Sequence, residues 1–292
     1  MRQHLLSFYY TIYFMKIFVR IFGLIGMLFA AFFLVLTINT DMSLHLVDYT
    51  YSNSLLDSNL NGLKIVQLSD FHNHSLTYKN GYLPEMVKSQ NPDVVFLTGD
   101  FIDQYTDKSN IDDINELLTY LKDIPTYYIT GNHEYYAAHQ EEFYDCLKSH
   151  SNVTFLQNET TYFTYNGAKV NLVGLNDPRI VFNDNNTKDE VMEDYYRPIV
   201  KSLMENVDDS FTICLSHRPG LFDMLSEFNI DVTFSGHTHG GQLAFFDFFK
   251  YQSGRYEKND STLLVSNGLG FNGKMPVRYN APMQLVSFTV NI

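Results

Sequence analysis

The sequence predicts a layered α/β domain that follows an apolar N-terminal helix. From residue 60 onward, short apolar strands alternate with helical stretches, which is typical of a sheet covered by helices. After residue 153 the strands follow one another more closely, which favours a second sheet packed face to face on the first, with helices outside both. No repeat, low-complexity stretch or linker interrupts residues 45–292, so we expect them to form one domain.

The expected elements follow from apolar runs and helical periodicity along the chain. Strands are expected over residues 63–69, 93–98, 125–130, 161–165, 169–174, 211–216, 231–235, 262–266 and 284–290. Helices are expected around residues 82–90, 111–122, 141–148, 190–205 and 220–228.

The N-terminal region predicts a membrane anchor over residues 21–38, after a short segment of residues 1–20. The run from 21 to 38 carries no charge and has about the minimum length of a membrane span. Lys16 and Arg20 precede the run and Asp41 follows it. The positive-inside rule then places the N-terminus in the cytoplasm and the rest of the chain outside, as a single-pass protein of the cell membrane.

Other interpretations of this region are a buried core helix, a cleaved signal peptide and a chain that starts at Met15. A core helix without one polar break over this length is unusual. The residues after the run, Thr37–Thr40, match a small-x-small cleavage site poorly, which favours a retained anchor over a signal peptide. A start at Met15 would give a short basic leader ahead of the same span.

The charge balance argues against a nucleic-acid partner. The chain has a formal net charge of −13, and residues 41–292 carry 17 basic against 33 acidic residues, a net of −16. A sequence-tolerant nucleic-acid binder needs a basic track that releases counterions. Phosphate-bearing substrates are not excluded, because bound divalent ions would invert the local sign of the charge at a site.

Five short motifs rich in histidine and acidic residues each follow an expected strand, where α/β sheets place their chemistry. In order along the chain they are Asp70-Phe71-His72, Gly99-Asp100, Gly131-Asn132-His133-Glu134, Ser216-His217 and Gly236-His237-Thr238-His239. In extended chain, positions i and i+2 face the same way, so both side chains of an Asp-x-His or His-x-His pair can reach one metal ion.

Each motif alone has an ordinary explanation. An isolated Asp-x-His or His-x-His is usually a surface or hydrogen-bonded pair, and a Gly-Asp or Gly-Asn-His is often only a turn. All five together, each at a strand end and with glycines where the backbone must turn sharply, indicate a metal site. Oxygen and imidazole ligands without a thiolate suit Mn²⁺, Fe or Zn²⁺, and the sequence does not choose among them.

In this order the motifs resemble those of the calcineurin-like metallophosphoesterase superfamily over roughly residues 63–290. The runs 235–242 (SGHTHGGQ), 216–219 (SHRP), 265–270 (VSNGLG) and 276–278 (PVR) narrow the resemblance to a membrane-anchored branch similar to UDP-2,3-diacylglucosamine pyrophosphatase-like phosphoesterases. The resemblance implies a four-layer α/β/β/α metallophosphoesterase sandwich. Phe71 stands where leucine is more usual, and Glu134 stands where aspartate is commoner.

The resemblance also implies a role for each motif residue. Seven side chains would hold two divalent ions, namely Asp70, His72 and His239 for one ion, Asn132, His217 and His237 for the other, and Asp100 as the bridge. His133 would donate a hydrogen bond or a proton toward the leaving-group oxygen. Every ligand position of the family pattern is filled, which disfavours an inactive relative.

Three further residues are candidates for contact with substrate. Arg218 and Arg278 could grip a phosphate, since a guanidinium binds phosphate through two parallel hydrogen bonds. A surface salt bridge is the alternative for either arginine.

His74 could reach the site, or could be a solvated loop histidine. Asp103 is expected to orient a loop or to contact a ligand. The aromatic run 245–249 could pack in a core strand, touch lipid or line an acyl pocket.

The predicted function is therefore that of a membrane-anchored, dinuclear-metal phosphohydrolase. The resemblance implies attack of a metal-bridged hydroxide on a phosphoester or pyrophosphate bond, in a lipid-linked or nucleotide-sugar substrate such as UDP-2,3-diacylglucosamine. The alternatives are a phosphodiesterase or phosphatase for soluble nucleotides, and a tethered protein that binds metal without catalysis.

Overall fold

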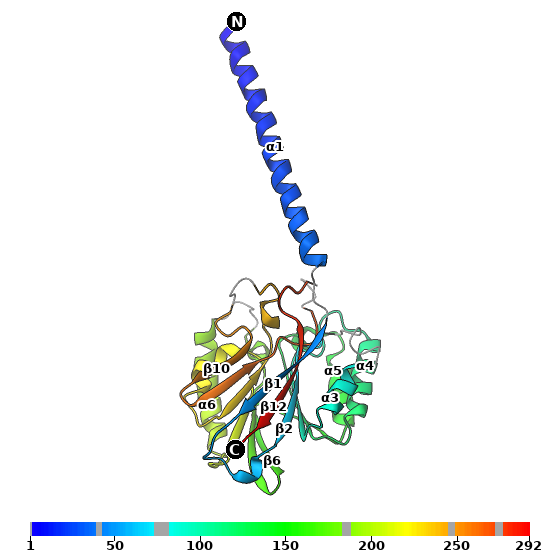
Figure 1. The fold of residues 1–292 in the computed structure, drawn as a ribbon, viewed down its shortest axis with the longest axis vertical. Coiled ribbons are helices and arrows are strands. Elements are labelled where there is room, and N and C mark those ends of the chain that lie inside the picture. The colour runs from blue at the N-terminus through cyan, green and yellow to red at the C-terminus, as the bar shows by residue number, and fades with distance from the viewer. Residues whose placement is uncertain (1, 39–42, 73–81, 183–187, 245–248, 272–276) are drawn as a thin grey trace.

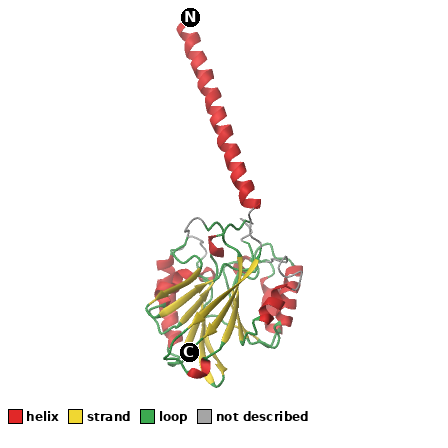
Figure 2. Cartoon of the chain, in the orientation of Figure 1, coloured by secondary structure: helices red, strands yellow, loops and turns green. Residues whose placement is uncertain are grey.

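Two six-stranded sheets form the centre of the protein in a computed structural model, which describes residues 2–38, 43–72, 82–182, 188–244, 249–271 and 277–292. The sheets lie face to face, with helices on their outer sides (Figures 1 and 2). The first sheet has the strand order β1-β12-β2-β3-β4-β5. Its strands are β1 (Leu44–Tyr51), β12 (Met283–Val290), β2 (Lys64–Leu68), β3 (Val94–Thr98), β4 (Thr126–Ile129) and β5 (Val153–Phe155).

Strands β2 to β5 of the first sheet are parallel, β12 runs antiparallel to β2, and β1 runs parallel to β12. The second sheet has the order β10-β11-β9-β8-β7-β6, with parallel central strands and an antiparallel strand at each edge. Its strands are β10 (Gly254–Lys258), β11 (Ser261–Val265), β9 (Val232–Ser235), β8 (Phe211–Leu215), β7 (Ala168–Gly174) and β6 (Glu159–Tyr165).

Helices other than α1 cover the outer face of each sheet. The α-helices are α1 (Arg2–Ile38), α3 (Tyr82–Ser89), α4 (Lys108–Tyr120), α5 (Gln140–Ser149), α6 (Asp189–Met204) and α7 (Phe222–Leu225). Short 3₁₀ turns are η1 (Ser58–Leu60), η2 (Glu134–Tyr136), η3 (Pro178–Ile180), η4 (Pro219–Leu221) and η5 (His239–Gly241).

Alternation along the strands builds three apolar layers. In β2, Ile65 packs between the two sheets, whereas Val66 and Leu68 pack against α3, α4 and α5 on the outer face. In β8, Ile213 faces the first sheet and Cys214 faces α6 and α7. Successive strand residues point to opposite faces, so strands covered on both sides read as continuous apolar runs. The predicted four-layer α/β/β/α arrangement is confirmed.

All predicted strands and all predicted helices except the one over 220–228 are present, with ends that differ by a few residues. Three strands were missed: β1, β5 and β10. Strand β5 has three residues and β10 is a charged edge strand with the sequence GRYEK, so neither produces an apolar run. The helix expected over 220–228 is instead the 3₁₀ turn η4 followed by the four-residue helix α7.

Helix α1 extends without a break from Arg2 to Ile38 and so includes both the predicted N-terminal segment and the predicted anchor. Its stretch Ile12–Val35 is long and apolar enough to cross a membrane, and none of it is buried against the rest of the described chain. The candidate span therefore begins earlier than residue 21 and contains Lys16 and Arg20. Figure 1 shows α1 projecting from the end of the molecule opposite to the C-terminus.

Candidate metal centre

The predicted motif residues meet at one edge of the two sheets. Asp70, Asp100 and Asn132 follow the carboxyl ends of β2, β3 and β4, and His217 and His237 follow those of β8 and β9. Parallel strands bring their carboxyl ends to the same edge, and face-to-face packing brings the two edges together. The motifs thus lie far apart in sequence and adjacent in space.

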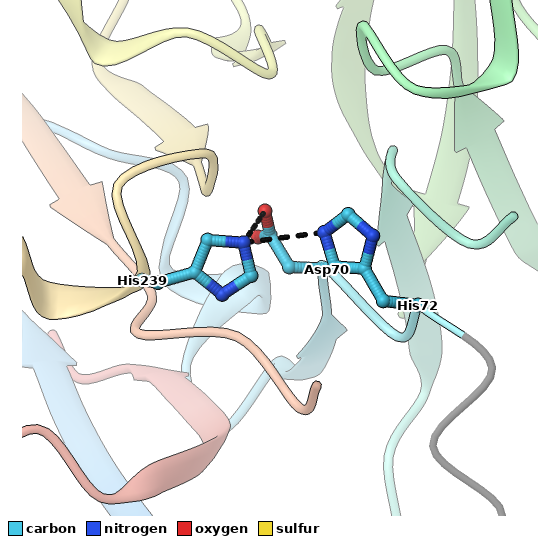
Figure 3. Close-up of side chains that lie close together, drawn as sticks. All are labelled: Asp70, His72 and His239. Atoms are coloured by element: carbon cyan, nitrogen blue, oxygen red, sulfur yellow. Dashed lines mark hydrogen bonds and ion pairs between the residues drawn. The ribbon is translucent and has the colours of Figure 1, made fainter. Parts of the chain in front are cut away.

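The first cluster consists of Asp70, His72 and His239 (Figure 3). The Nε2 atoms of the two histidines are 3.2 Å apart, and Nε2 of His239 lies 3.5 Å from Oδ1 of Asp70. All three side chains are buried, and each offers a ligand atom within 4.8 Å of the others. The group can therefore hold one metal ion.

The second cluster consists of Asp100, His217 and His237. Nε2 of His217 lies 3.1 Å from Oδ2 of Asp100, and the His217 and His237 ring centroids are 5.1 Å apart. The same Oδ2 of Asp100 is 3.6 Å from Nε2 of His72 in the first cluster. Asp100 therefore lies between the two clusters, the position that a bridging carboxylate requires.

Four buried polar atoms of the motif residues have no hydrogen-bond partner within the described part of the chain. They are Nδ1 of His72, Oδ1 of Asn132, Nδ1 of His133 and Nε2 of His217. A buried polar atom without a partner costs about 1–3 kcal/mol, so such atoms are rare unless something else satisfies them. An amide oxygen and an imidazole nitrogen are both metal ligands, and the described donor set contains no thiolate. The residues present fit a divalent ion next to Asp100.

The electrostatics of the cluster favour added positive charge. Burial raises the pKa of the Asp70 carboxyl, although His217 opposes the shift. Burial also raises the pKa of Asp100, but His217 and His133 outweigh it and the net pKa lies well below its usual range. Burial lowers the pKa of His217, and the Asp100 carboxylate outweighs this and brings that pKa to about 10. Two carboxylates at this depth need positive neighbours, a role that divalent ions fill.

The backbone at the cluster is strained. Five of the seven predicted ligands have left-handed backbone, and their φ angles are 52° (Asp70), 45° (His72), 56° (Asp100), 71° (His237) and 51° (His239). A residue with a Cβ pays roughly 1–2 kcal/mol for this conformation, and such strain gathers at functional sites. These left-handed residues lie in the loops that follow β2, β3 and β9, where the chain leaves the direction of the strand.

Two glycines allow close approach to the carboxylates. A Cβ at Gly131 would collide with the carboxylate of Asp100, and a Cβ at Gly236 would collide with the carboxylate of Asp70 and the hydroxyl of Ser69. Neither glycine has a positive φ, so close approach and not a sharp turn explains them. The expected turn role holds at Gly99, whose φ is 88°.

Glu134 joins two of the ligand loops from a fully buried position. Oε2 accepts hydrogen bonds from the backbone N–H groups of Asp100 (3.1 Å) and Gly131 (2.9 Å), and Oε1 accepts one from Phe101 (2.7 Å). Burial, followed by the charge of Asp100, raises the pKa of Glu134 to about 7. The glutamate therefore fixes the loop after β3 against the loop after β4.

We expect Glu134→Gln to lower the free energy of unfolding by about 1–3 kcal/mol, because one amide N–H₂ group would then face backbone N–H donors. Thermal unfolding of the metal-depleted protein measures this effect without a contribution from bound ions. A matched change is Glu142→Gln on the exposed surface of α5, which should leave the unfolding curve in place. Equal stability of the two variants would contradict the role assigned to Glu134.

Arg278 lies behind the first cluster and is completely buried. Its guanidinium donates to the carbonyls of Gly270, Ala281 and Asn267, and its Nη2 lies 3.0 Å from Nδ1 of His239. The alternative interpretation of Arg278 as a partner in a surface salt bridge is therefore wrong. The predicted grip on a substrate phosphate is not supported either, because the guanidinium contacts main chain and His239. Its position instead fixes the ring of His239.

We expect Arg278→Met to weaken metal binding by about 10–100-fold, the usual effect of removing a partner that orients a metal-bound histidine. Metal content after dialysis against graded chelator measures the change independently of turnover. Arg278→Lys keeps a positive charge without the planar fork and should recover only part of the affinity. Unchanged metal affinity in Arg278→Met would show that His239 is held by the loop alone.

The remaining predicted residues lie in different settings. The guanidinium of Arg218 donates to the buried carboxylate of Asp177, with Nε–Oδ2 at 2.8 Å and Nη2–Oδ1 at 3.2 Å. Two of its donors are therefore already paired with a carboxylate.

Asp103 contacts a predicted metal ligand, since its Oδ2 lies 3.6 Å from Nδ1 of His72. This contact is one of the two roles expected for Asp103 from the sequence. His74 and residues 245–248 of the aromatic run lie outside the described residues. Phe249 is exposed, with its ring centroid 6.4 Å from that of His237.

Comparison with known proteins agrees with the fold. The family Calcineurin-like phosphoesterase matches residues 63–241. The uncharacterized protein YpbG of Bacillus subtilis is 31% identical over 222 residues, which cover 75% of this chain and 77% of that protein. An uncharacterized metallophosphoesterase of Helicobacter pylori strain J99 is 31% identical over 236 residues, 76% of this chain and 58% of the relative.

A transmembrane protein with metallophosphoesterase domain from Bos taurus is 29% identical over 248 residues, which cover 79% of this chain and 53% of that protein. The matched region thus spans little more than half the length of the Helicobacter and bovine relatives. The family match covers all five ligand motifs and more than half of this chain. The protein belongs to the calcineurin-like phosphoesterase family.

Proposed function

We propose that this protein is a membrane-anchored hydrolase of phosphoester or pyrophosphate bonds that works with two divalent metal ions. The observation that carries the proposal is the position of Asp100. One of its carboxylate oxygens lies 3.1 Å from His217 and 3.6 Å from His72, so a single oxygen faces both ligand clusters. The two ions would neutralise charge on the phosphoryl oxygens and lower the pKa of water, which supplies a nucleophile near neutral pH.

The ligand assignment follows the two clusters. Asp70, His72 and His239 would hold one ion, and Asp100 would be shared with the second. Asn132, His217 and His237 would complete the second site, which the partnerless oxygen of Asn132 supports. The identity of the metal is open among Mn²⁺, Fe and Zn²⁺, because imidazole and oxygen ligands suit all three.

His133 is proposed as the group that assists departure of the leaving oxygen. Its backbone N–H donates to Oδ1 of Asp100 (2.8 Å), and its ring centroid lies 4.7 Å from that of His72. The ring is thereby held beside the bridge. In the reaction, water adds across one P–O bond. The water oxygen joins phosphorus, the bond to the leaving oxygen breaks, and that oxygen receives a proton, which His133 is placed to donate.

The proposed substrate is a lipid-linked or nucleotide-sugar phosphoester or pyrophosphate close to the bilayer, such as the pyrophosphate UDP-2,3-diacylglucosamine. Two features support this class: the unburied apolar stretch Ile12–Val35 of α1, and the resemblance of the tail motifs to a membrane-anchored branch. The basic residues Lys16 and Arg20 before most of this stretch support an extracytoplasmic location for the hydrolase domain.

Parallel assays on metal-reconstituted full-length protein test the reaction class. The substrates are bis(p-nitrophenyl) phosphate, p-nitrophenyl phosphate and UDP-glucose, which represent a diester, a monoester and a pyrophosphate. We expect hydrolysis of the diester or the pyrophosphate that chelator abolishes and added Mn²⁺ restores. Metal binding without hydrolysis of any of the three would contradict the proposal and would favour a tethered metal-binding protein. Turnover of the monoester alone would reassign the enzyme as a phosphatase.

A further inference from the structure

Exposed apolar side chains lie in the loops at the edge of the sheets where the predicted ligands lie. They follow the carboxyl ends of β3, β4, β7 and β9, and we call them the apolar rim, made of Tyr105, Tyr135, Tyr136, Ile180, Val181 and Phe249. Tyr105 is 62% exposed and Ile180 is 54% exposed, so neither is covered by the described part of the chain. Exposed apolar side chains gathered at one edge indicate a surface that meets something apolar.

The apolar rim is joined to the ligand loops by direct contacts. The guanidinium of Arg179 in η3 lies over the ring of Tyr136 in η2, 4.6 Å from its centroid. Phe249 contacts the ring of His237. The apolar side chains of the loops after β4, β7 and β9 are therefore held in place by contacts with the loops that contain the ligands.

Helix α1 enters the domain at this same edge. Strand β1 is parallel to β12, and β12 is antiparallel to β2. The first residue of β1, Leu44, therefore lies at the edge where β2 ends and Asp70 follows. The C-terminus lies at the opposite edge, and Figure 1 shows α1 and the C-terminus at opposite ends of the molecule.

The connection between α1 and β1 is short. Helix α1 ends at Ile38 and β1 begins at Leu44. A chain extends by at most about 3.3–3.6 Å per residue, so this connection spans no more than about 22 Å even when fully stretched. A span formed by α1 would keep the ligand edge within that distance of the bilayer boundary.

The opposite edge has a different surface. A polar hollow there is lined by four aspartates, which are Asp208, Asp209, Asp231 and Asp260. Carboxylates are repelled by an anionic membrane surface and are well solvated in water. The acidic end and the apolar rim therefore face away from each other, which matches one end in water and one end against a bilayer.

We propose that the metal centre opens toward the membrane surface and that its substrates are phosphoesters of membrane lipids, hydrolysed while the lipid stays in the bilayer. This inference rests on the proposed function and specifies in addition that the substrate reaches the metal centre from the membrane side. The tyrosines of the apolar rim suit the headgroup region, where an aromatic ring with a polar tip is most stable. Ile180, Val181 and Phe249 would contact the acyl boundary.

The test compares one leaving group in two settings. Full-length protein is reconstituted with Mn²⁺ in phosphatidylcholine vesicles that contain phosphatidyl p-nitrophenol, and water converts this lipid into phosphatidic acid and p-nitrophenol. Bis(p-nitrophenyl) phosphate in solution releases the same p-nitrophenol. The ratio of the two rates measures access to lipid separately from the chemistry of the centre.

The decisive variant carries a ten-residue proline-rich insertion between residues 40 and 41. It lifts the domain by about 30 Å, because such a segment extends about 3.1 Å per residue. We expect the lipid rate to fall at least about tenfold through loss of effective concentration, while the soluble rate stays the same. A Gly/Ser insertion of equal length is the control, since its flexible chain lets the domain return to the surface and should retain most of the lipid rate.

The apolar rim is tested by the double variant Tyr105→Ser, Ile180→Ser. Its ratio of lipid to soluble rate should fall several-fold, because apolar contact with the bilayer is lost. Leu55→Ser is the matched control: Leu55 is 92% exposed and lies in the turn after β1, at the opposite edge. Its ratio should equal that of the unchanged protein.

Two failures are distinguishable. Absence of metal-dependent hydrolysis of bis(p-nitrophenyl) phosphate, p-nitrophenyl phosphate and UDP-glucose alike would overturn the proposed function itself. Normal hydrolysis of that diester, together with a lipid rate that neither the rigid insertion nor the rim variant lowers, would overturn only the membrane-facing orientation.

Discussion

Asp100→Asn is expected to abolish hydrolysis of a chromogenic phosphodiester. Asp100 is 1% exposed, and its Oδ2 faces ligand nitrogens of both clusters. An asparagine has the same shape but loses the negative charge that two cations share, and its N–H₂ group would face them as a donor. We expect the rate to fall by at least about 10³-fold, within the range that electrostatic stabilisation of a transition state supplies.

The matched control for this change is Asp231→Asn. Asp231 is another partly buried aspartate that accepts a backbone hydrogen bond, from Thr212 (2.8 Å), but it lies before β9, at the edge far from the ligands. Its variant should hydrolyse the diester at the unchanged rate. Substantial turnover by Asp100→Asn would contradict the bridging role of Asp100 and the proposal that one of its oxygens is shared by both metal sites.

His133→Ala is expected to lower the hydrolysis rate by about 10²–10⁴-fold while both ions stay bound, the usual loss when a proton donor is removed. His133 is half-buried, and burial lowers its pKa although Asp100 opposes the shift. Its contact with Asp100 is made by the backbone N–H, which alanine retains. The bridge should therefore stay in place when the ring is removed.

The leaving group separates a proton donor from a structural residue. Loss of a proton donor slows departure of a basic alkoxide much more than departure of p-nitrophenolate, which needs little protonation. We therefore expect the deficit of His133→Ala to be larger on an alkyl diester than on bis(p-nitrophenyl) phosphate. His139→Ala, at a partly exposed histidine before α5, serves as the control. Loss of bound metal from His133→Ala would instead make His133 a ligand, since its ring also lies within reach of His72 and Asp100.

The meeting of the ligands could be predicted from the sequence because each motif directly follows an apolar strand. The carboxyl ends of β2, β3, β4, β8 and β9 bring Asp70, Asp100, Asn132, His217 and His237 to one edge, as strand-end chemistry in α/β sheets implies. Both the two-sheet arrangement and the outer helices follow from the same alternation of runs. This part of the fold depends on local pattern and on parallel pairing, which are visible in one sequence.

Other features depend on contacts between distant residues and had no local signal. Strand β1 pairs with β12 at the far end of the chain, and only that pairing reveals that α1 enters at the ligand edge. The contact of Arg278 with His239 needs a tail that folds back behind the centre. The positive φ angles of Asp70 and Asp100 occur at residues whose type does not demand them, so the surrounding structure imposes them.

The measurement that tests the central claim most directly is a metal titration of the stripped full-length protein, with bound metal per chain and hydrolysis of bis(p-nitrophenyl) phosphate followed in the same samples. Two clusters that share Asp100 predict that full activity appears only as the second equivalent of metal binds. Full activity at one equivalent, or activity that persists with no metal bound, would contradict a dinuclear centre at this edge of the sheets.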